Sequence, residues 1–297
     1  MPDPVNPPDP NPALGAAAEA GPETAAAAGP AAAPAAASGT LDAAAADGAS
    51  GAAAAEAADA PAQAAAAAAA AAAEADPRDE RPQYVLPLVV RLERDAPPQR
   101  TDALETAARA VLTLLADERS RGEGEWAEVV EAWQDARIRK VVRRARGGEW
   151  RKALTLPGLT VTGEQAEVRV YPPIPLDGWP RELGRLQVSG TDFGDDAPPP
   201  PPAPGVPVVW MNPDVEMTAG KAMAQAGHAA QLGWWTLAEP DAKAWAAAGF
   251  PLAVRTATRE DWARLVRAGL PVVRDAGFTE IAPGSATALA EFTELAR

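Results

Sequence analysis

VPVVWMNPDVEMTAGKAMAQAGHAAQLGWW, from Val206 to Trp235, is the stretch around which the rest of the chain is organised. It opens with an apolar run, Val206–Met211, whose length and β-branched residues predict a strand. A loop rich in Pro and Asp follows at Asn212–Met217. Thr218 then offers a hydroxyl to cap a helix, which is predicted over Ala219–Leu237. The Ala, Gly and Met residues of this helix would let it lie very close to a sheet.

Three polar side chains fall on one face of the predicted helix. Lys221, Gln225 and His228 are spaced i, i+4 and i+7, so they form a single stripe. Lys221 would be in the first turn, where the helix dipole disfavours a cation by about 0.3–1 kcal/mol. Taken alone, Lys221 could equally be a solvated lysine at a helix start, and His228 an interior histidine with no functional role. All three together, beside a strand end, favour a ligand site.

A second stretch, PVVRDAGFTEIAPGSATALA from Pro271 to Ala290, carries a carboxylate among small residues. A strand predicted at Pro271–Arg274 delivers Asp275 at its end, and another strand is predicted at Ala286–Ala290. Glycines let backbone N–H groups approach a reacting oxygen, and hydroxyl side chains add further donors. The combination suits a hydrolytic site. For an Asp-Ala-Gly sequence alone, the alternative is a turn that needs these residues only for its geometry. The small residues in question are Gly277, Thr279, Gly284, Ser285 and Thr287.

Together these two stretches resemble a known family. G-K-x-x-x-Q-x-x-H-A at Gly220–Ala229 and D-A-G-x-T-x-I-A-P-G-S-x-T at Asp275–Thr287 are similar to peptidyl-tRNA hydrolase of the second type, the archaeal and eukaryotic class. The resemblance covers Pro207–Phe292. It implies an α/β/α domain with a mixed four-stranded sheet. It also implies an aminoacyl- or peptidyl-tRNA hydrolase, which cleaves the carboxylic ester between a peptide and tRNA.

The resemblance also implies roles for individual residues. The family's functional lysine, aspartate and threonine fall on Lys221, Asp275 and Thr279, which we expect to be catalytic. As our own hypothesis for the division of these roles, Asp275 would position or deprotonate water, and Lys221 would neutralise charge at the carbonyl oxygen or hold the terminal phosphate. Thr279 would donate to the same oxygen or orient the water. The positions expected to support the site or to contact substrate are Gln225, His228, Gly277, Gly284, Ser285 and Thr287.

The sequence departs from the family pattern at three places beside the motifs. Thr218-Ala219-Gly220 stand where a second basic residue is usual, Phe278 stands where the motif is usually followed by Arg, and Glu280 stands where Gln is common. The surface expected to meet tRNA therefore loses two positive charges and gains a negative one. An alternative function is a non-catalytic module that binds tRNA or the ribosome.

Composition excludes several other kinds of chemistry. The chain has no cysteine and a single histidine, His228, which excludes disulfides and a thiolate nucleophile and argues against an ordinary zinc site. We therefore expect neither a metal nor a cofactor. The opening residues MPDPVNPPDP have no basic or apolar region of a signal peptide, and the alanine run Ala64–Ala73 is too short to span a membrane. A cytoplasmic protein with no membrane partner is the expectation.

Residues 1–82, rich in Ala, Pro, Gly and acids, are predicted to form a disordered tail. Up to residue 80 they hold twelve acids against one base, Arg78, and almost no large apolar residue. Such a segment buries too little apolar surface to offset the entropy of ordering it. Eleven of the fourteen excess negative charges lie there, so the rest of the chain is near neutral and compatible with an RNA partner.

A second set of elements precedes the motifs and repeats their order. Ala132–Leu154 aligns without gaps on Ala244–Val266 at an offset of 112, which pairs Trp133 with Trp245. We infer an internal duplication, whose first copy is a degenerate hydrolase domain. The predicted elements are strands at Tyr84–Leu92, Ile138–Arg144, Leu159–Thr162 and Ala166–Tyr171, and helices at Thr101–Glu118, Trp126–Asp135 and Glu149–Leu154.

The first copy lacks the catalytic groups and carries a basic run instead. Its first helix is predicted to be capped by Thr101 or Asp102, and Thr101 is aligned with Thr218. Residues 137–152 hold eight bases against one acid, a net charge of +7, which suits either a solvated face or contact with tRNA phosphates. The aligned pairs are Leu104 with Lys221, Ala108 with Gln225, Val111 with His228 and Gly163 with Asp275. The candidate tRNA-binding residues are Arg139, Lys140, Arg143, Arg144 and Arg146.

The expected organisation is two related α/β/α domains, each with a small mixed four-stranded sheet. They span residues 83–193 and 206–297, and residues 194–205 form a Pro-rich linker. A short linker raises the effective concentration of one copy near the other to roughly millimolar. We therefore expect a monomer that contains an internal pseudo-dimer and binds peptidyl-tRNA, with a homodimer as the alternative.

Overall fold

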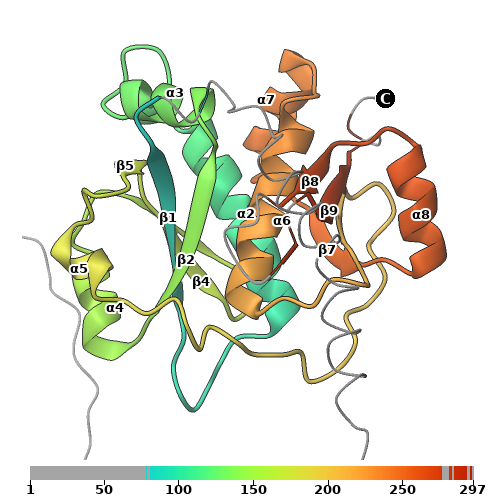
Figure 1. The fold of residues 1–297 in the computed structure, drawn as a ribbon, viewed down its shortest axis with the longest axis horizontal. Helices are drawn as coiled ribbons and strands as arrows, with labels where there is room; N and C mark the ends of the chain where they lie inside the picture. The colour runs from blue at the N-terminus through green and yellow to red at the C-terminus, as the bar shows by residue number, and fades with distance from the viewer. Residues whose placement is uncertain (1–77, 79–80, 276–280, 283, 293–294, 296–297) are drawn as a thin grey trace, which may run out of the picture. The chain divides into compact units, whose positions relative to one another are not determined.

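The computed structural model of the chain describes residues 78, 81–275, 281–282, 284–292 and 295. Within them lie two mixed β-sheets with helices packed on them (Figure 1). We call residues 81–193 the N-terminal lobe and residues 206–292 the C-terminal lobe. The predicted α/β class with a small mixed sheet in each lobe is confirmed. The predicted tail lies outside the described residues, apart from residues 78, 81 and 82.

The N-terminal sheet is built on the strand β1 (Tyr84–Arg91), whose residues 85–90 are all buried. Such a continuous apolar run is typical of a strand covered on both faces. β1 pairs in parallel with β2 (Arg139–Ala145) and antiparallel with β4 (Glu167–Val170), which in turn pairs with β3 (Leu159–Thr162). A fifth strand, β5 (Ile174–Pro175), pairs with the start of β1, and the sequence did not predict it.

Helices cover both faces of this sheet. Leu86, Leu88 and Val90 belong to the apolar cluster that includes the long helix α2, whereas Val89 packs on the opposite face with Trp150 of α4. This alternation along one strand makes the lobe a three-layer structure. The helical segments are α2 (Arg100–Ala116), η2 (Glu118–Ser120), α3 (Ala127–Asp135), α4 (Gly147–Ala153) and α5 (Arg181–Gly184).

The C-terminal sheet has the same strand order and the same strand directions as the N-terminal sheet. Its central strand β6 (Val208–Met211) pairs in parallel with β7 (Ala253–Thr256) and antiparallel with β9 (Ala286–Glu291). β9 pairs antiparallel with β8 (Val272–Arg274). Since β6, β7 and β8 run in one direction, their carboxyl ends meet at one edge of the sheet.

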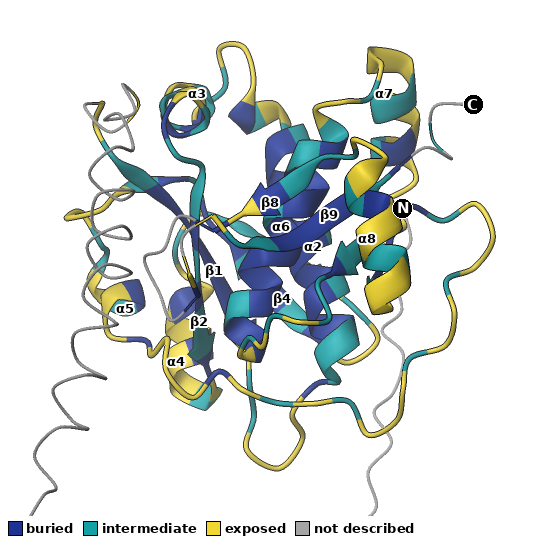
Figure 2. Ribbon diagram, turned by 45° about the vertical axis from the view of Figure 1, so that its right-hand side comes forward, coloured by how far each residue is buried: buried dark blue, intermediate teal, exposed yellow. Residues whose placement is uncertain are grey.

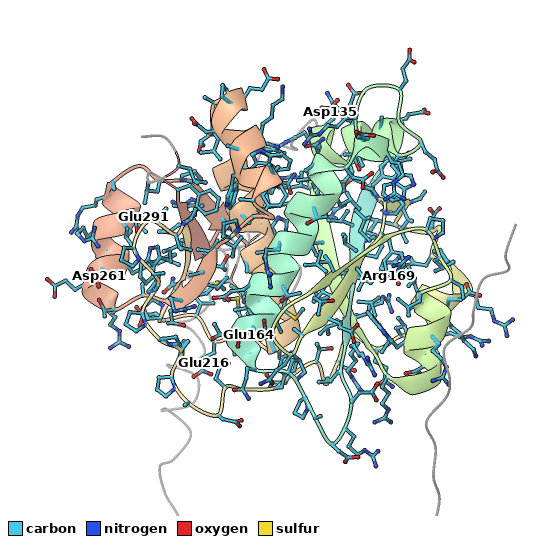
Figure 3. All side chains as sticks on the ribbon, turned by 180° about the vertical axis from the view of Figure 1, so that it is seen from behind. Asp135, Glu164, Arg169, Glu216, Asp261 and Glu291 are labelled. Carbon is cyan, nitrogen blue, oxygen red and sulfur yellow. The ribbon has the colours of Figure 1, made fainter. Side chains whose placement is uncertain are left out.

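The main helix of the C-terminal lobe is α6 (Ala219–Trp234), which ends three residues before the predicted Leu237. Its predicted cap is confirmed, because the Thr218 side chain accepts a hydrogen bond from the backbone N–H of Lys221. α7 (Glu239–Ala247) follows it. The outer helix α8 (Arg259–Arg267) is largely exposed (Figure 2), and its Asp261 points away from the rest of the lobe (Figure 3).

α2 and α6 pack against each other between the two sheets (Figure 1). Small residues allow the close approach: a Cβ atom on Gly227 of α6 would lie only 2.9 Å from Cγ2 of Val111 on α2. The two helices and both sheets share one apolar cluster. Each helix also touches the outer parallel strand of the opposite sheet, α2 with β7 and α6 with β2.

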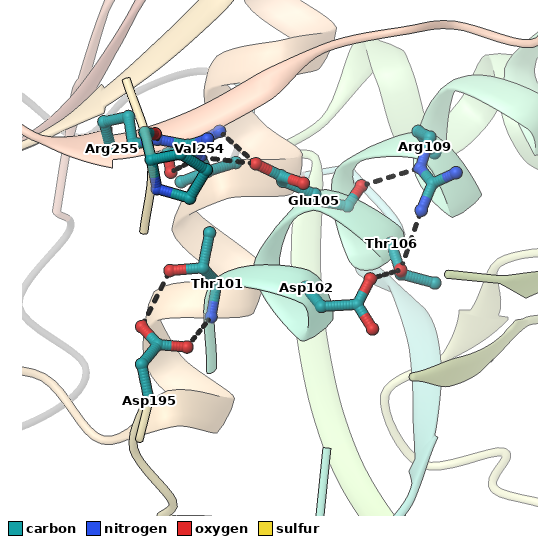
Figure 4. A network of polar contacts seen from close by, with 9 residues as sticks. Thr101, Asp102, Glu105, Thr106, Arg109, Asp195, Val254 and Arg255 are labelled. Atoms are coloured by element: carbon teal, nitrogen blue, oxygen red, sulfur yellow. Dashed lines mark hydrogen bonds and ion pairs between the residues drawn. The ribbon is translucent and has the colours of Figure 1, made fainter. Parts of the chain in front are cut away.

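The last residues of the N-terminal lobe and the segment after them are fixed to the amino ends of these helices. The Asp195 carboxylate accepts hydrogen bonds from the backbone N–H and the hydroxyl of Thr101, at 2.8 and 2.7 Å (Figure 4). The carbonyl of Thr191 accepts from the N–H of Gly220 at 2.9 Å. Asp192 accepts from the first N–H of α6 at 3.3 Å. The chain therefore caps both central helices with residues from the end of the first predicted domain and from the predicted linker.

The predicted cap of α2 is wrong. The helix begins at Arg100 with Gln99 as its N-cap, and it ends at Ala116 rather than Glu118. Asp102 lies in the first turn, but its carboxylate points away from the helix end, toward the loop after β3. In the part of the chain that the structure describes, no helix is long and apolar enough to cross a membrane.

Candidate active site

Lys221 and Asp275 form an ion pair at the carboxyl edge of the C-terminal sheet. The Nζ atom of Lys221 lies 2.5 Å from Oδ2 of Asp275. Asp275 directly follows β8, and Lys221 lies in the first turn of α6, so the strand end and the helix start bring the two motifs together. The Asp275 side chain is 4% exposed and the Lys221 side chain 17%. A charge pair this shielded from water interacts more strongly than a surface pair.

Gln225 and Thr287 hold the carboxylate in place. The Gln225 amide, one helical turn after Lys221, donates from Nε2 to the same Oδ2 of Asp275 at 2.9 Å. The amide oxygen of Gln225 accepts from the Thr287 hydroxyl at 2.8 Å. The Thr287 hydroxyl also lies 3.4 Å from the carbonyl of Val273. Gln225 therefore orients the aspartate.

Backbone hydrogen bonds join Asp275 to Gly284 and Ser285. The N–H of Asp275 donates to the carbonyl of Ser285 at 2.9 Å, and the N–H of Gly284 donates to the carbonyl of Asp275 at 2.7 Å. Gly284 has φ = 79°, a conformation that favours glycine. Two of the expected supporting residues thus act through the backbone. A third supporting residue, Gly277, lies outside the described residues, as do the expected catalytic Thr279 and the departures Phe278 and Glu280.

His228 belongs to a different cluster. Its Nδ1 atom lies 3.2 Å from Nζ of Lys140, which comes from β2 of the N-terminal lobe. Burial lowers the pKa of His228 well below its usual value, and the positive charges of Lys140 and Lys221 lower it further. The stripe predicted on the helix is therefore divided: Lys221 and Gln225 hold Asp275, and His228 contacts the other lobe.

A cleft of about 540 Å³ opens at the amino end of α6, where Thr218, three residues before Lys221, forms part of its wall. Arg100 marks its boundary on the N-terminal lobe, and its guanidinium donates to the carbonyl of Met217 at 2.9 Å. Both lobes therefore contribute to the walls, which the sequence could not indicate, because the contributing positions are distant in the chain. The lining includes Arg100, Leu104, Asp192, Met211, Thr218 and Thr256.

The region that holds this site matches one known family. Residues 206–292, 87 of the 297 in the chain, match the family model for peptidyl-tRNA hydrolase PTH2. The C-terminal lobe is PTH2-like. Lys221, Gln225, Asp275 and Thr287 all lie inside the matched region, whereas Lys140 lies outside it. No curated protein matches the chain.

The basic run of the N-terminal lobe is largely engaged within the protein. Lys140 is buried, at 8% exposure. Arg139 donates to the side chain of Gln83. Arg144 donates to the side chain of Gln187 and to the carbonyl of Ser189. Arg143 donates to the carbonyl of Gly184, the last residue of α5, and to that of Leu186 just after it. Burial lowers the pKa of Arg143. The exposed members of the run are Arg146, Arg151 and Lys152.

The N-terminal lobe has other residues at the position that corresponds to the Lys221–Asp275 pair. By their pairing, β3 and β4 are the counterparts of β8 and β9. Gly163 therefore directly follows β3 as Asp275 directly follows β8. Asp102 and Thr106, one turn apart on α2, lie against Gly163, as Lys221 and Gln225 lie against Asp275. The expected pairing of Leu104 with Lys221 is therefore wrong by two residues, because the two helices correspond from Gln99 and Thr218, their caps.

The described residues do not suggest a metal site. Among them, no group of three or more His, Asp or Glu side chains lies close enough to hold an ion. The cluster instead provides an ammonium, a carboxylate, an amide and a hydroxyl in contact with one another. Such a set binds polar groups and moves protons, which suits hydrolysis of an ester.

Proposed function

We propose that the C-terminal lobe hydrolyses the ester between a peptide and tRNA, releasing free peptide and tRNA. The observation that carries the proposal is the shielded Lys221–Asp275 pair, held by Gln225, inside the region that matches the family model. The fold brings together residues that are 54 positions apart in the chain. This constellation has the parts that ester hydrolysis needs, a group to orient water and a cation for developing negative charge.

In this proposal, Asp275 orients the attacking water and takes its proton. The water oxygen forms a bond with the ester carbonyl carbon, and negative charge develops on the carbonyl oxygen. The Lys221 ammonium, held on α6, stabilises that charge. The bond to the ribose oxygen then breaks, and the proton passes to the leaving ribose hydroxyl. Thr279 would add a donor to the carbonyl oxygen or the water, and Thr287 keeps the Gln225 amide turned toward Asp275.

The cleft at the amino end of α6 is the proposed site for the end of the substrate. Its volume of about 540 Å³ falls in the range of small-molecule sites. Arg100 and Thr218 provide donors at its walls, and Leu104 and Met211 provide apolar surface. This composition suits the terminal nucleoside and the ester-linked residue of a peptidyl-tRNA.

The decisive experiment is turnover with purified peptidyl-tRNA. Release of peptide and intact tRNA, abolished in Asp275→Asn, would support the proposal. The alternative is a non-catalytic module, and it would show binding of tRNA with no release of peptide by the wild-type chain. Free peptidyl-tRNA and peptidyl-tRNA in the presence of ribosomes should be compared, because the alternative also includes ribosome binding.

We infer that the N-terminal lobe is a degenerate copy of the C-terminal lobe. Trp133 donates from Nε1 to the carbonyl of Arg139 at 2.9 Å, and Trp245 donates to the carbonyl of Pro251 at 2.9 Å. Both donors and both acceptors are 112 positions apart, the offset of the sequence alignment. Ile138 and its counterpart Phe250 both have positive φ, 42° and 58°. Such strain costs about 1–3 kcal/mol at a non-glycine residue, so its repetition supports common descent.

The duplication supports a monomer that contains a pseudo-dimer. Contact of α2 with β7 and of α6 with β2 is the reciprocity expected of a two-fold interface. We propose that this internal pairing replaces a homodimer. Sedimentation of the full chain should give the monomer mass across micromolar concentrations, and a dimer that forms at these concentrations would contradict the proposal.

A further inference from the structure

We propose that Lys140 of the N-terminal lobe is a positioning residue for the catalytic helix α6, which it joins by donating a hydrogen bond to Nδ1 of neutral His228. The consequence for catalysis rests on the proposed function. Lys140 lies outside the region that matches the family model, so the active site of the C-terminal lobe would be incomplete without its neighbour. Nothing in the sequence patterns distinguishes Lys140 from the other bases of its run.

The contacts of Lys140 account for all three hydrogens of an ammonium group. Its Nζ atom lies 2.5 Å from Oε1 of Gln231, 3.2 Å from Nδ1 of His228 and 3.3 Å from the carbonyl of Ile138. A lysine ammonium has three donors and no acceptor. Nδ1 of His228 is then an acceptor, so the proton of the neutral imidazole is on Nε2.

The Lys140 side chain packs between Gly227 of α6 and the ring of Trp133. The stem of Lys140 passes Gly227 of α6, where a Cβ atom would lie 3.5 Å from Cδ of the lysine and closer still to Val111. The Nζ atom lies 4.7 Å from the ring centre of Trp133, within the range of a cation–π interaction. Lys140 is thus enclosed by an aromatic ring on one side and α6 on the other.

The charged groups around His228 make its protonation unfavourable. Lys140 on β2 and Lys221 on α6 are both cations, and both lower the pKa of His228 in addition to burial. The acids on neighbouring elements point elsewhere: Glu105 of α2 pairs with Arg255, and Asp275 after β8 pairs with Lys221. Burial lowers the pKa of Lys140 well below its usual value, whereas its three hydrogen-bond acceptors and the Trp133 ring favour the ammonium form.

The link to the active site runs along α6. His228 follows Gln225 by three residues, so the two side chains leave neighbouring positions on one side of the helix. Protonation of His228 would place a charge in the enclosed space between α6 and β2, 3.2 Å from Nζ of Lys140 in the wild-type chain. The cost of desolvating that charge would push α6 away from β2 with or without Lys140. Because Gln225 orients Asp275, a shift of this helix would misplace the carboxylate. Lys140 therefore extends to lower pH the range over which the site stays assembled.

Nuclear magnetic resonance of the single histidine tests the contact without any substrate. In the wild-type chain, ¹⁵N shifts should report a proton on Nε2 and none on Nδ1 at pH 7. Lys140→Met, which keeps an unbranched side chain one atom shorter and removes the charge, should raise the pKa of His228 by about one unit. Lys152→Met, at an exposed lysine of the same lobe, should leave it unchanged. A proton on Nδ1 in the wild type, or no shift in Lys140→Met, would overturn the inference.

Turnover then tests the consequence for catalysis. In Lys140→Met the acid limb of the kcat profile should move to higher pH by the same amount as the pKa of His228, with KM little changed. A purely structural role would lower activity equally at every pH. If wild-type protein hydrolyses peptidyl-tRNA and the limb does not move, Lys140 has no positioning role. Absence of wild-type turnover contradicts the proposed function instead, and the histidine shifts still test the contact.

Discussion

A side chain at Gly163 would overlap the carboxylate of Asp102. In the N-terminal lobe, Asp102 occupies the space that a residue equivalent to Asp275 would need. Its two oxygens accept hydrogen bonds from three successive backbone N–H groups, at 3.0, 2.7 and 2.7 Å. The helix of this lobe thus provides the carboxylate, and the loop provides only backbone donors. In the N-terminal lobe, a structural contact therefore stands where the C-terminal lobe has the Lys221–Asp275 pair.

Gly163→Ala and Asp102→Ala should therefore both destabilise the chain. Asp102→Ala leaves three donors of the loop at 164–166 without their acceptor, and a lost bond to a charged group costs about 1.5–3 kcal/mol. Gly163→Ala should cost a similar amount, because the added methyl group must displace the carboxylate. Denaturant midpoints should fall in both variants while the dependence on denaturant stays constant. Gly148→Ala is the control, since its Cβ would meet only a flexible arginine side chain at 3.7 Å.

Asp275→Asn and Lys221→Met should each reduce hydrolysis strongly without unfolding the protein. Losing a positioned acid–base group typically costs ~10²–10⁴-fold in rate. Thr287→Val should have a smaller effect, because it only releases the amide of Gln225. Single-turnover rates and circular dichroism would measure both properties. Wild-type turnover in Asp275→Asn would exclude the proposed mechanism.

The two lobes should be coupled through Glu105 and Arg255. Oε1 of Glu105 on α2 lies 2.6 Å from Nη1 of Arg255 and 3.1 Å from the N–H of Val254, both on β7 (Figure 4). The two side chains are mostly shielded from water, so a double-mutant cycle of Glu105→Ala and Arg255→Ala should give a coupling of about 0.5–3 kcal/mol. The exposed pair Arg259 and Asp214 should give under about 1 kcal/mol. Equal coupling in both cycles would count against a fixed interface.

Reversal of the exposed bases should weaken tRNA binding. Arg146→Glu, Arg151→Glu and Lys152→Glu together should lower affinity and flatten its salt dependence, since each phosphate contact adds about 0.7–0.9 to the log–log slope. The rate at saturating substrate should barely change. Arg264→Glu with Arg267→Glu on α8 is the control. Binding that responds equally to both sets would indicate a general charge effect rather than a contact surface.

Acidification should destabilise the chain through His228. Its folded-state pKa is lowered, so below about pH 6.5, the usual value, the unfolded chain binds a proton that the folded chain does not. Unfolding then becomes more favourable by up to about 1.4 kcal/mol per pH unit, until the folded-state pKa is reached. Stability curves between pH 7 and pH 5 should show this slope, and His228→Gln should reduce it. An unchanged slope in the variant would assign the effect to other groups.

Much of the fold was predictable because local patterns agree with the tertiary structure. The apolar run before Thr218, the hydroxyl cap and the helix rich in small residues are local signals, and each has the expected structure. The strand β3 has its predicted bounds, Leu159–Thr162. The cap of α2 was not predictable in the same way, because Asp102 has the chemistry of a cap but bonds to a loop about sixty residues away.

The sequence by itself determined the α/β class and brought Lys221, Gln225 and Asp275 together as candidates, because their spacing and strand-end position are local properties. Only the tertiary structure decided what each one touches. It turned Gln225 to the aspartate, directed His228 to Lys140 of the other lobe, and placed Asp102 against Gly163. The physical reason is that these partners lie 50 to 88 residues apart along the chain. Contacts of that kind depend on how two helices and two sheets pack, which no local pattern specifies.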